Sequence, residues 1–351
     1  MADVNKSPSQ SRLLLISVPR TASNLMLKIL NIPGQKLVTN EKGGYFFFNA
    51  FFKVSFNGHL TLPLEERSEA QKREIREIRD AFQEAVDGLE DCAQRAEQEG
   101  KIAFAKEHAF WLTNPAELGN RADDAASFRP RISDKYGPSH TFSPLNHTVL
   151  PDEYLRTWRL TFIIRHPALA FPSLCRALQK FEQSGLSQKE DGAGSMETNL
   201  TLKWTRMLYD WCLEQPDLPG KPLVVDAQDI IHNPQVMVRY CEETGLDPRA
   251  LQFEWESKQE VPDRQTMGPD SQRQKKSDVD FDRTEAQAFM LLTLSRSTGI
   301  IKDKTPTAVD ITAEAKQWKE EFGEELASIL ETTVRDAMPD YEYLRSRRIT
   351  V

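Results

Sequence analysis

The chain has 351 residues, of which 39% are hydrophobic and 28% are charged. This length and composition predict a soluble globular protein with a proper core, large enough for one large α/β domain or two small ones. The formal net charge of −8 at pH 7 argues against a surface that binds nucleic acid broadly. A small anionic ligand would therefore need a local cluster of arginines and lysines.

The four cysteines are widely spaced, and no two of them form a Cys-x-x-Cys pair. We therefore expect reduced thiols rather than a disulfide framework or a zinc site. The first apolar run, "LLLIS", is too short for the core of a signal peptide or for a membrane span. These features favour a cytoplasmic protein that binds neither membranes nor nucleic acid, and they leave the oligomeric state open.

Strands and helices alternate along most of the chain. Residues 1–11 are expected to be a disordered lead-in, and residues 12–351 to form a single domain. This alternation predicts an α/β fold in three layers, with a central parallel sheet and helices on both faces. We predict strands at 13–18, 101–108, 158–167 and 221–230. We predict helices at 23–30, 65–100 (highly charged), from 167 onward, at 201–215 and 233–246, and near 283–298 and 312–337. Loops are predicted at 184–195 and 257–280.

The turn between the first strand and the first helix reads "PRTASN". Backbone N–H groups at the start of a helix attract an anion, and the side chains of Ser23 and Asn24 add further donors. Arg20 adds a permanent charge with a forked geometry. The alternative is that Thr21 or Ser23 caps the helix while Arg20 lies in solvent.

The strand at 101–108 ends in "KEH". Lys106 and His108 are two residues apart, so their side chains should project from one face of the strand while Glu107 points away. A histidine can accept a proton near neutral pH, and a neighbouring ammonium can stabilise charge on a transferred group. The alternative is a surface lysine beside a structural histidine.

A third polar pair follows the strand at 158–167. Arg165 ends its apolar run, and Ser173 lies two turns into the helix that follows. Together they could hold a phosphate, because a guanidinium and a hydroxyl both donate to its oxygens. Taken alone, the pair could equally be a salt-bridged arginine and an ordinary helix serine. Three anion-compatible clusters at three strand ends favour a ligand site, because ligands of parallel sheets bind at that edge.

These motifs resemble the cytosolic-type sulfotransferase family in its microbial and fungal branch, which uses 3′-phosphoadenosine-5′-phosphosulfate (PAPS). The "PRTASN" turn is similar to the family's Pro-Lys/Arg-Ser-Gly-Ser/Thr-Thr turn, and "KEH" matches its Lys-x-His strand end. Arg165 and Ser173 keep the eight-residue spacing of the family's 3′-phosphate site. Later segments such as "WTRMLYDW" and "LSRSTGI" extend the resemblance to about residue 300.

The resemblance implies a P-loop-like fold that uses PAPS as co-substrate and needs no metal. His108 would be the base that deprotonates an acceptor hydroxyl, and Lys106 would stabilise the transferring sulfuryl group. Arg20 would offset charge on the leaving phosphate. The residues implied to hold PAPS are Arg20, Thr21, Ala22, Ser23, Asn24, Arg165 and Ser173.

Two residues depart from the family pattern. Ala22 stands where the family has glycine, and its methyl group could crowd an amide that approaches the phosphate. Asn24 stands where the family has a hydroxyl residue. The family's C-terminal Arg-Lys-Gly segment is also absent, and lysines and arginines within 257–280 could replace it.

The segment 41–56 is the most aromatic part of the chain. Family members place acceptor-binding loops in such positions, so we expect Tyr45, Phe47, Phe48 and Phe52 to line a pocket for a small hydrophobic or phenolic acceptor. The alternative is that these rings pack the core.

Two other functions remain compatible with the sequence. An enzyme of this fold could instead catalyse an elimination, dehydration or rearrangement in secondary metabolism. The substitutions at Ala22 and Asn24 motivate this hypothesis. The chain could also be a non-catalytic nucleotide-binding protein.

Overall fold

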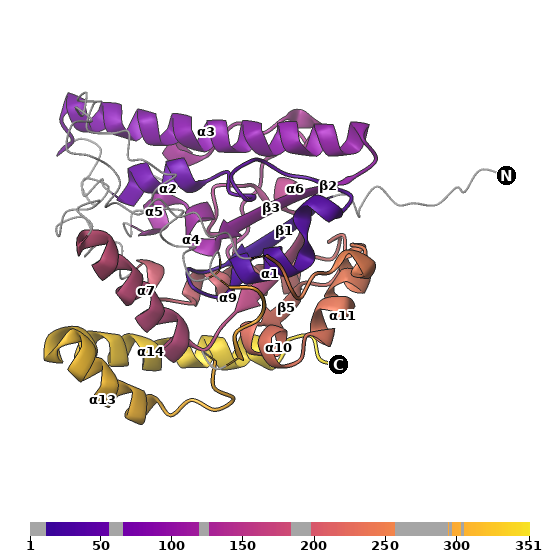
Figure 1. The fold of residues 1–351 in the computed structure, drawn as a ribbon. Coiled ribbons are helices and arrows are strands. Elements are labelled where there is room, and N and C mark those ends of the chain that lie inside the picture. Colours follow the sequence, from indigo (N-terminus) through magenta and orange to yellow (C-terminus); the bar gives the residue numbers. More distant parts are fainter. Residues whose placement is uncertain are drawn as a thin grey trace, which may run out of the picture.

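The protein is built around a sheet of five parallel strands, in the order β2-β3-β1-β4-β5 (Figure 1). The computed structural model describes residues 12–55, 66–118, 126–183, 198–256, 294, 297–302 and 305–351. Among these residues the strands are β1 (Arg12–Ser17), β2 (Leu37–Val38), β3 (Ile102–His108), β4 (Arg159–Ile164) and β5 (Leu223–Asp226).

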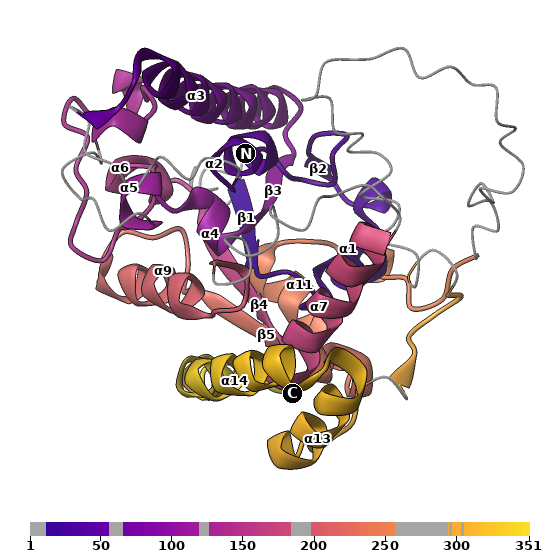
Figure 2. The ribbon, with the colours of Figure 1, turned by 90° about the vertical axis from the view of Figure 1, so that its left-hand side faces the viewer.

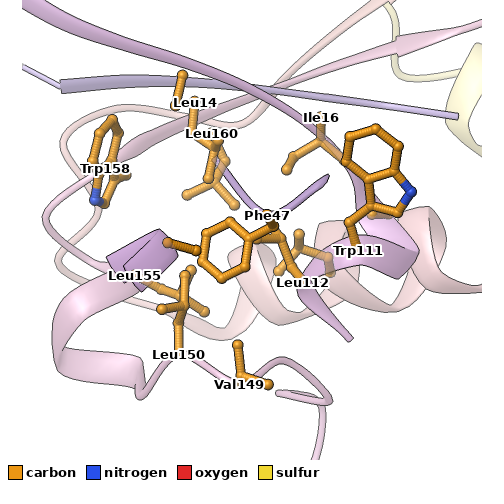
Figure 3. Close-up of a cluster of buried hydrophobic side chains, with 14 of the residues drawn as sticks. Leu14, Ile16, Phe47, Trp111, Leu112, Val149, Leu150, Leu155, Trp158 and Leu160 are labelled. Carbon is orange, nitrogen blue, oxygen red and sulfur yellow. The ribbon is translucent and has the colours of Figure 1, made fainter. Parts of the chain in front are cut away.

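The central strand β1 is buried on both faces, as its continuous apolar sequence predicts. Leu13 and Leu15 pack into the hydrophobic cluster on one side of the sheet. Leu14 and Ile16 pack into the cluster on the other side, where Figure 3 shows them beside Phe47. Each buried leucine or isoleucine contributes roughly 1.5–3 kcal/mol, so β1 joins both halves of the core.

Helices cover both faces of the sheet, which confirms the predicted three-layer α/β fold. One face carries α2 (Phe48–Ser55), α3 (Glu69–Gln98), α4 (Ala109–Leu112) and α9 (Lys203–Glu214). The opposite face carries α1 (Ser23–Leu30) and α11 (Gln235–Thr244).

A third hydrophobic cluster joins α7 (Pro167–Gln183), α13 (Ile311–Phe322) and α14 (Glu324–Arg345). Figures 1 and 2 show α3 along one edge of the molecule and the pair α13 and α14 along the other. The remaining short helical elements are η2 (Ile32–Gly34), α5 (Pro115–Leu118), η6 (Asp134–Tyr136), α6 (Asp152–Leu155), α10 (Ala227–His232) and η8 (Pro248–Ala250).

The long charged helix predicted at 65–100 is α3. Ser68 and Gln71 form a capping box at its start, which satisfies two of the helix's unpaired N–H groups. Its apolar residues recur at helical spacing and are buried against the sheet and α2. The chain leaves the helix at Gly100, which has a φ of 61° and therefore favours glycine.

The structure corrects several predicted boundaries. The strand predicted at 221–230 ends at Asp226, because the Asp226 carboxylate accepts from Gln228 N (2.9 Å) and starts α10. The helix predicted at 312–337 is two helices, α13 and α14, which are separated at Gly323 (φ 83°). Helix α2 and strand β2 were not predicted at all.

Several predictions fall outside the described residues. These are the disordered lead-in, the loops at 184–195 and 257–280, and most of the helix near 283–298. Among the described helices, none is both long and apolar enough to cross a membrane. No group of three or more potential metal ligands occurs in the described part of the chain.

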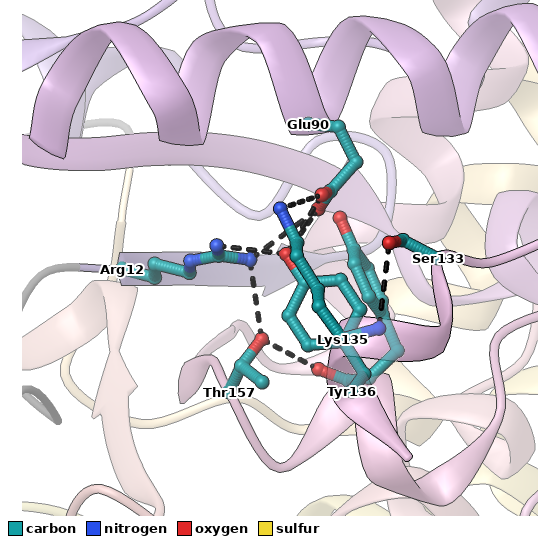
Figure 4. Close-up of polar contacts among 7 residues, drawn as sticks. Arg12, Glu90, Ser133, Lys135, Tyr136 and Thr157 are labelled. Carbon is teal, nitrogen blue, oxygen red and sulfur yellow. Dashed lines mark hydrogen bonds and ion pairs between the residues drawn. The ribbon is translucent and has the colours of Figure 1, made fainter. Parts of the chain in front are cut away.

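A polar cluster at the amino end of β1 ties α3 to the sheet (Figure 4). Glu90 of α3 accepts from the Tyr136 hydroxyl (2.7 Å) and pairs with Lys135 Nζ (2.8 Å). Arg12 Nη1 lies 3.4 Å from the same carboxylate, and its Nη2 donates to Tyr136 (2.9 Å). Burial raises the pKa of Glu90, but the contacts with Lys135, Tyr136 and Arg12 outweigh it and leave the pKa below its usual value.

Replacing Glu90 with glutamine is expected to lower the free energy of unfolding by about 1–2 kcal/mol at pH 7, since Arg12 and Lys135 lose their counter-charge. Because the folded-state pKa of Glu90 is lowered, its contribution is present above about pH 4.3 and is lost as the pH falls through the folded value. Urea titrations at pH 7 and pH 3.5 should show the difference shrinking at the lower pH. Glu69→Gln, at an exposed pair with Lys72, is the control that should barely move the midpoint. A Glu90 variant as stable as the wild type at pH 7 would contradict this account.

Candidate active site

The turn that joins β1 to α1 has an unusual backbone. Arg20 (φ 66°) and Ala22 (φ 63°) both adopt the left-handed conformation, with Thr21 between them. The Thr21 hydroxyl donates to Val18 O (2.8 Å) and closes the turn from inside. Alternating conformations of this kind turn successive N–H groups toward one concave side and make an anion-binding nest.

Two arginines and a serine lie together beside this turn. Arg20 Nε donates to Ser173 Oγ of α7 (3.1 Å). Arg165, which follows β4, donates from Nη1 to the Arg20 carbonyl (3.1 Å) and from Nη2 to Thr305 Oγ1 (3.4 Å). The structure therefore brings Arg20, Arg165 and Ser173 together, with Ser173 bonded to Arg20, whereas the sequence analysis pairs it with Arg165.

The Arg165 guanidinium is unusually buried for a charged group. Burial and then the charge of Arg20 lower its pKa to about 10, and Asp226 opposes the shift. Its Nε is buried and has no hydrogen-bond partner among the described residues. An anion between the two guanidinium groups would relieve their repulsion and satisfy this donor.

Lys106 and His108 project from the same face of β3, on the side of the turn. Lys106 is fully buried, and its Nζ donates to Asn24 Oδ1 (2.6 Å). Burial lowers the pKa of Lys106 to about 7, and the charge of Glu107 opposes the shift. Burial and then the charge of Lys106 lower the pKa of His108 to about 3, so the imidazole is neutral at pH 7. Glu107 points to the opposite side, where its carboxylate accepts from Phe47 N (3.1 Å).

Tyr45 links the lysine to the histidine. Its ring centroid lies 4.1 Å from Lys106 Nζ, and its hydroxyl lies 3.4 Å from His108 Nε2. Gly44 makes this position possible, since Lys106 N donates to the Gly44 carbonyl (2.9 Å) and a Cβ at Gly44 would meet the same nitrogen at 3.0 Å. Tyr45 also makes a hydrogen bond with Ser23. The phenol therefore contacts both the strand end and the turn.

The other residues of the aromatic segment divide between the site and the core. Phe47 is fully buried and packs against Phe82 of α3, with ring centroids 6.1 Å apart. Phe48 is partly buried and contacts both Phe52 (6.0 Å) and Trp111 (5.3 Å). Phe48 also packs against the edge of the core cluster, so it lies between the core and Trp111.

Sequence reasoning missed two residues next to His108. Trp111 of α4 lies edge-on to the imidazole, with centroids 4.4 Å apart, and also contacts Tyr45 (4.8 Å). Ser17, the last residue of β1, has its Oγ 2.9 Å from His108 Nδ1. The signal for Trp111 is its position three residues after His108, on the next helical turn. The signal for Ser17 is the pairing of β1 with β3.

The fold and the site together are typical of α/β enzymes that bind phosphate-bearing substrates at the carboxyl edge of a parallel sheet. The chain is 36% identical over 350 residues to the sulfotransferase ppzF of Metarhizium majus (strain ARSEF 297), which covers 97% of both chains. It is 35% identical over 355 residues to the sulfotransferase ppzF of Metarhizium rileyi (strain RCEF 4871), with 96% of both chains covered. The chain therefore belongs to the sulfotransferase family of transferase enzymes.

Two further comparisons concern protein-family models and solved structures. No protein-family model matches the sequence. The sulfotransferase domain of the olefin synthase from Synechococcus PCC 7002 aligns with a TM-score of 0.37 and 13% identity, over 91% of this chain and 97% of that domain.

Replacing Ala22 with glycine is expected to stabilise the fold. The left-handed conformation costs alanine roughly 1–2 kcal/mol, while glycine adds about 0.4–1 kcal/mol of chain entropy to the unfolded state. The net gain of about 0.5–1 kcal/mol should appear as a rise of about 1–2 °C in Tm by calorimetry. The control Ala70→Gly, at an exposed position in the first turn of α3, should change Tm in the opposite direction. A fall in Tm for Ala22→Gly would show that the methyl group packs favourably.

Proposed function

We propose that this sulfotransferase moves a sulfuryl group from PAPS to a hydroxyl of a small hydrophobic or phenolic acceptor, with His108 as the base. The observation that carries the proposal is the convergence of Arg20, Arg165 and Lys106 with a neutral imidazole around one left-handed turn. A donor that carries several anionic groups suits this concentration of positive charge.

The residues beside the turn fit the two ends of such a donor. The N–H groups from Arg20 to Asn24, with the side chains of Ser23 and Asn24, would hold the 5′-phosphosulfate. Arg165 and Ser173 would hold the 3′-phosphate, and the buried Arg165 Nε is a donor suited to one of its oxygens.

In the reaction, the acceptor oxygen forms a bond to sulfur while the bond from sulfur to the phosphate oxygen breaks. His108, whose imidazole is neutral at pH 7, takes the hydroxyl proton. Lys106 and Arg20 offset the negative charge on the sulfuryl oxygens and the leaving phosphate. The products are a sulfate ester and 3′-phosphoadenosine-5′-phosphate.

Aromatic rings beside the base support an apolar acceptor. The His108 ring lies 4.4 Å from Trp111, 5.4 Å from Tyr45 and 5.7 Å from Phe110, measured between centroids. A phenol could stack among these rings with its hydroxyl toward His108. Phe48 and Phe52 would extend this surface outward, whereas Phe47 contributes through the packing of α2.

Calorimetric titration with 3′-phosphoadenosine-5′-phosphate tests the donor site. The wild type should prefer this ligand to AMP and to ATP, which lack the 3′-phosphate. Arg165→Ala should weaken its binding about 10- to 100-fold and leave AMP binding nearly unchanged, because charge-assisted hydrogen bonds contribute about 1.5–3 kcal/mol. Arg335→Ala, at an exposed pair with Glu331 of α14, is the control that should bind like the wild type. Equal binding of the 3′-phosphorylated ligand and AMP would contradict the assigned 3′-phosphate site.

Turnover of a panel of phenols with PAPS tests the base and the reaction. His108→Gln should lower kcat by about 10²- to 10⁴-fold, the usual contribution of a general base, with donor affinity retained. His147→Gln, which removes the partner of Glu117 instead, should leave turnover intact. Mass spectrometry of the product decides the reaction, since sulfation adds a sulfuryl group and elimination or rearrangement does not. Sulfation of sugars or peptides alone would overturn the proposed acceptor class.

A further inference from the structure

Ser17 and His108 are cross-strand partners in the pairing of β1 with β3. In adjacent parallel strands such partners present their side chains on the same face, and both residues lie at the carboxyl ends of their strands. The Ser17 side chain is fully buried. Its Oγ lies 2.9 Å from His108 Nδ1 and 3.2 Å from the Glu107 carbonyl oxygen.

The direction of these hydrogen bonds follows from counting protons. A serine hydroxyl has one proton, and a carbonyl oxygen can only accept. If the Ser17 proton goes to the Glu107 carbonyl, the Ser17 oxygen can contact Nδ1 favourably only as an acceptor.

The opposite side of the ring fits the same assignment. The Tyr45 hydroxyl lies 3.4 Å from Nε2 and can donate to it when that nitrogen is unprotonated. Since burial and Lys106 keep the imidazole neutral, the ring holds one proton, and only its position decides whether Nε2 can act as a base.

We propose that Ser17 is a positioning residue that holds the proton of His108 on Nδ1 and so leaves Nε2 as the nitrogen that faces the acceptor hydroxyl. The catalytic part of this inference rests on the proposed role of His108 as base. The tautomer itself is a property of the protein without substrate.

Nitrogen NMR of the ¹⁵N-histidine-labelled protein tests the tautomer directly. His108→Gln identifies the resonances of His108 among those of the six histidines. The expected spectrum at pH 7 shows a protonated Nδ1 and an unprotonated Nε2, and Ser17→Ala should shift both toward a mixture of tautomers. A protonated Nε2 in the wild type, or an unchanged tautomer in Ser17→Ala, would overturn the inference.

Steady-state kinetics with a phenol acceptor measures the consequence. Ser17→Ala should lower kcat about tenfold, the effect of losing one hydrogen bond of ordinary strength, and leave the affinity for 3′-phosphoadenosine-5′-phosphate unchanged. Ser17→Thr retains the hydroxyl and should restore both the tautomer and kcat. Thr161→Val removes another fully buried hydroxyl from the sheet, on β4, and should change neither.

The two proposals fail in different ways. If His108→Gln turns over normally while Ser17→Ala still redistributes the proton, the assignment of the base fails and the tautomer assignment stands. If His108→Gln is inactive and Ser17→Ala keeps both tautomer and kcat, the base stands and the role of Ser17 fails.

Discussion

The parallel pairing of β1 with β3 is the constraint on which the site depends. It sets Ser17 beside His108 and Leu15 beside Lys106, so the end of β3 lies next to the turn that leaves β1. A shift of one residue would move Lys106 and His108 to the opposite face of the sheet. The side chains of β1 are buried alternately in the two hydrophobic clusters, so a slip would exchange their places and disturb the close packing on both faces. The packing of the core therefore fixes the positions of the site residues on β1 and β3.

The second feature on which the site depends is a group of buried, positively charged side chains. Arg165 contacts the Arg20 carbonyl at the turn, and burial lowers the pKa of both guanidinium groups. Lys106 is also fully buried, and it is held by Asn24 of the same turn and by the face of Tyr45. Such a concentration of cations is costly in isolation and becomes favourable when an anion lies among them. A chain with a net charge of −8 thus carries a local site of the opposite sign.

Much of the fold could be predicted from the sequence, and so could the edge of the sheet at which the candidate site residues lie, because strand ends in a parallel sheet share one edge. The order of the motifs placed Arg20, Arg165, Ser173, Lys106 and His108 at that edge. In the structure Arg20 contacts Arg165 and Ser173, and Lys106 bonds to Asn24 of the same turn. What could not be predicted depends on contacts between distant segments. The left-handed conformation of Ala22 gives no local signal, since alanine normally avoids it. Phe47 and Tyr45 have similar sequence surroundings, yet one packs beneath α3 and the other over Lys106.

The burial of Lys106 couples ligand binding to protons. A lysine in an unfolded chain titrates near 10.4, whereas burial holds Lys106 near 7 in the fold. Between these values the unfolded chain binds more protons than the folded protein without ligand. This residue therefore makes the folded protein more stable as the pH rises from 7 toward 10. An anion beside the ammonium group reverses the balance, because it favours the charged form. Donor binding near neutral pH would then take up a proton from the buffer, and its affinity would fall as the solution becomes more alkaline.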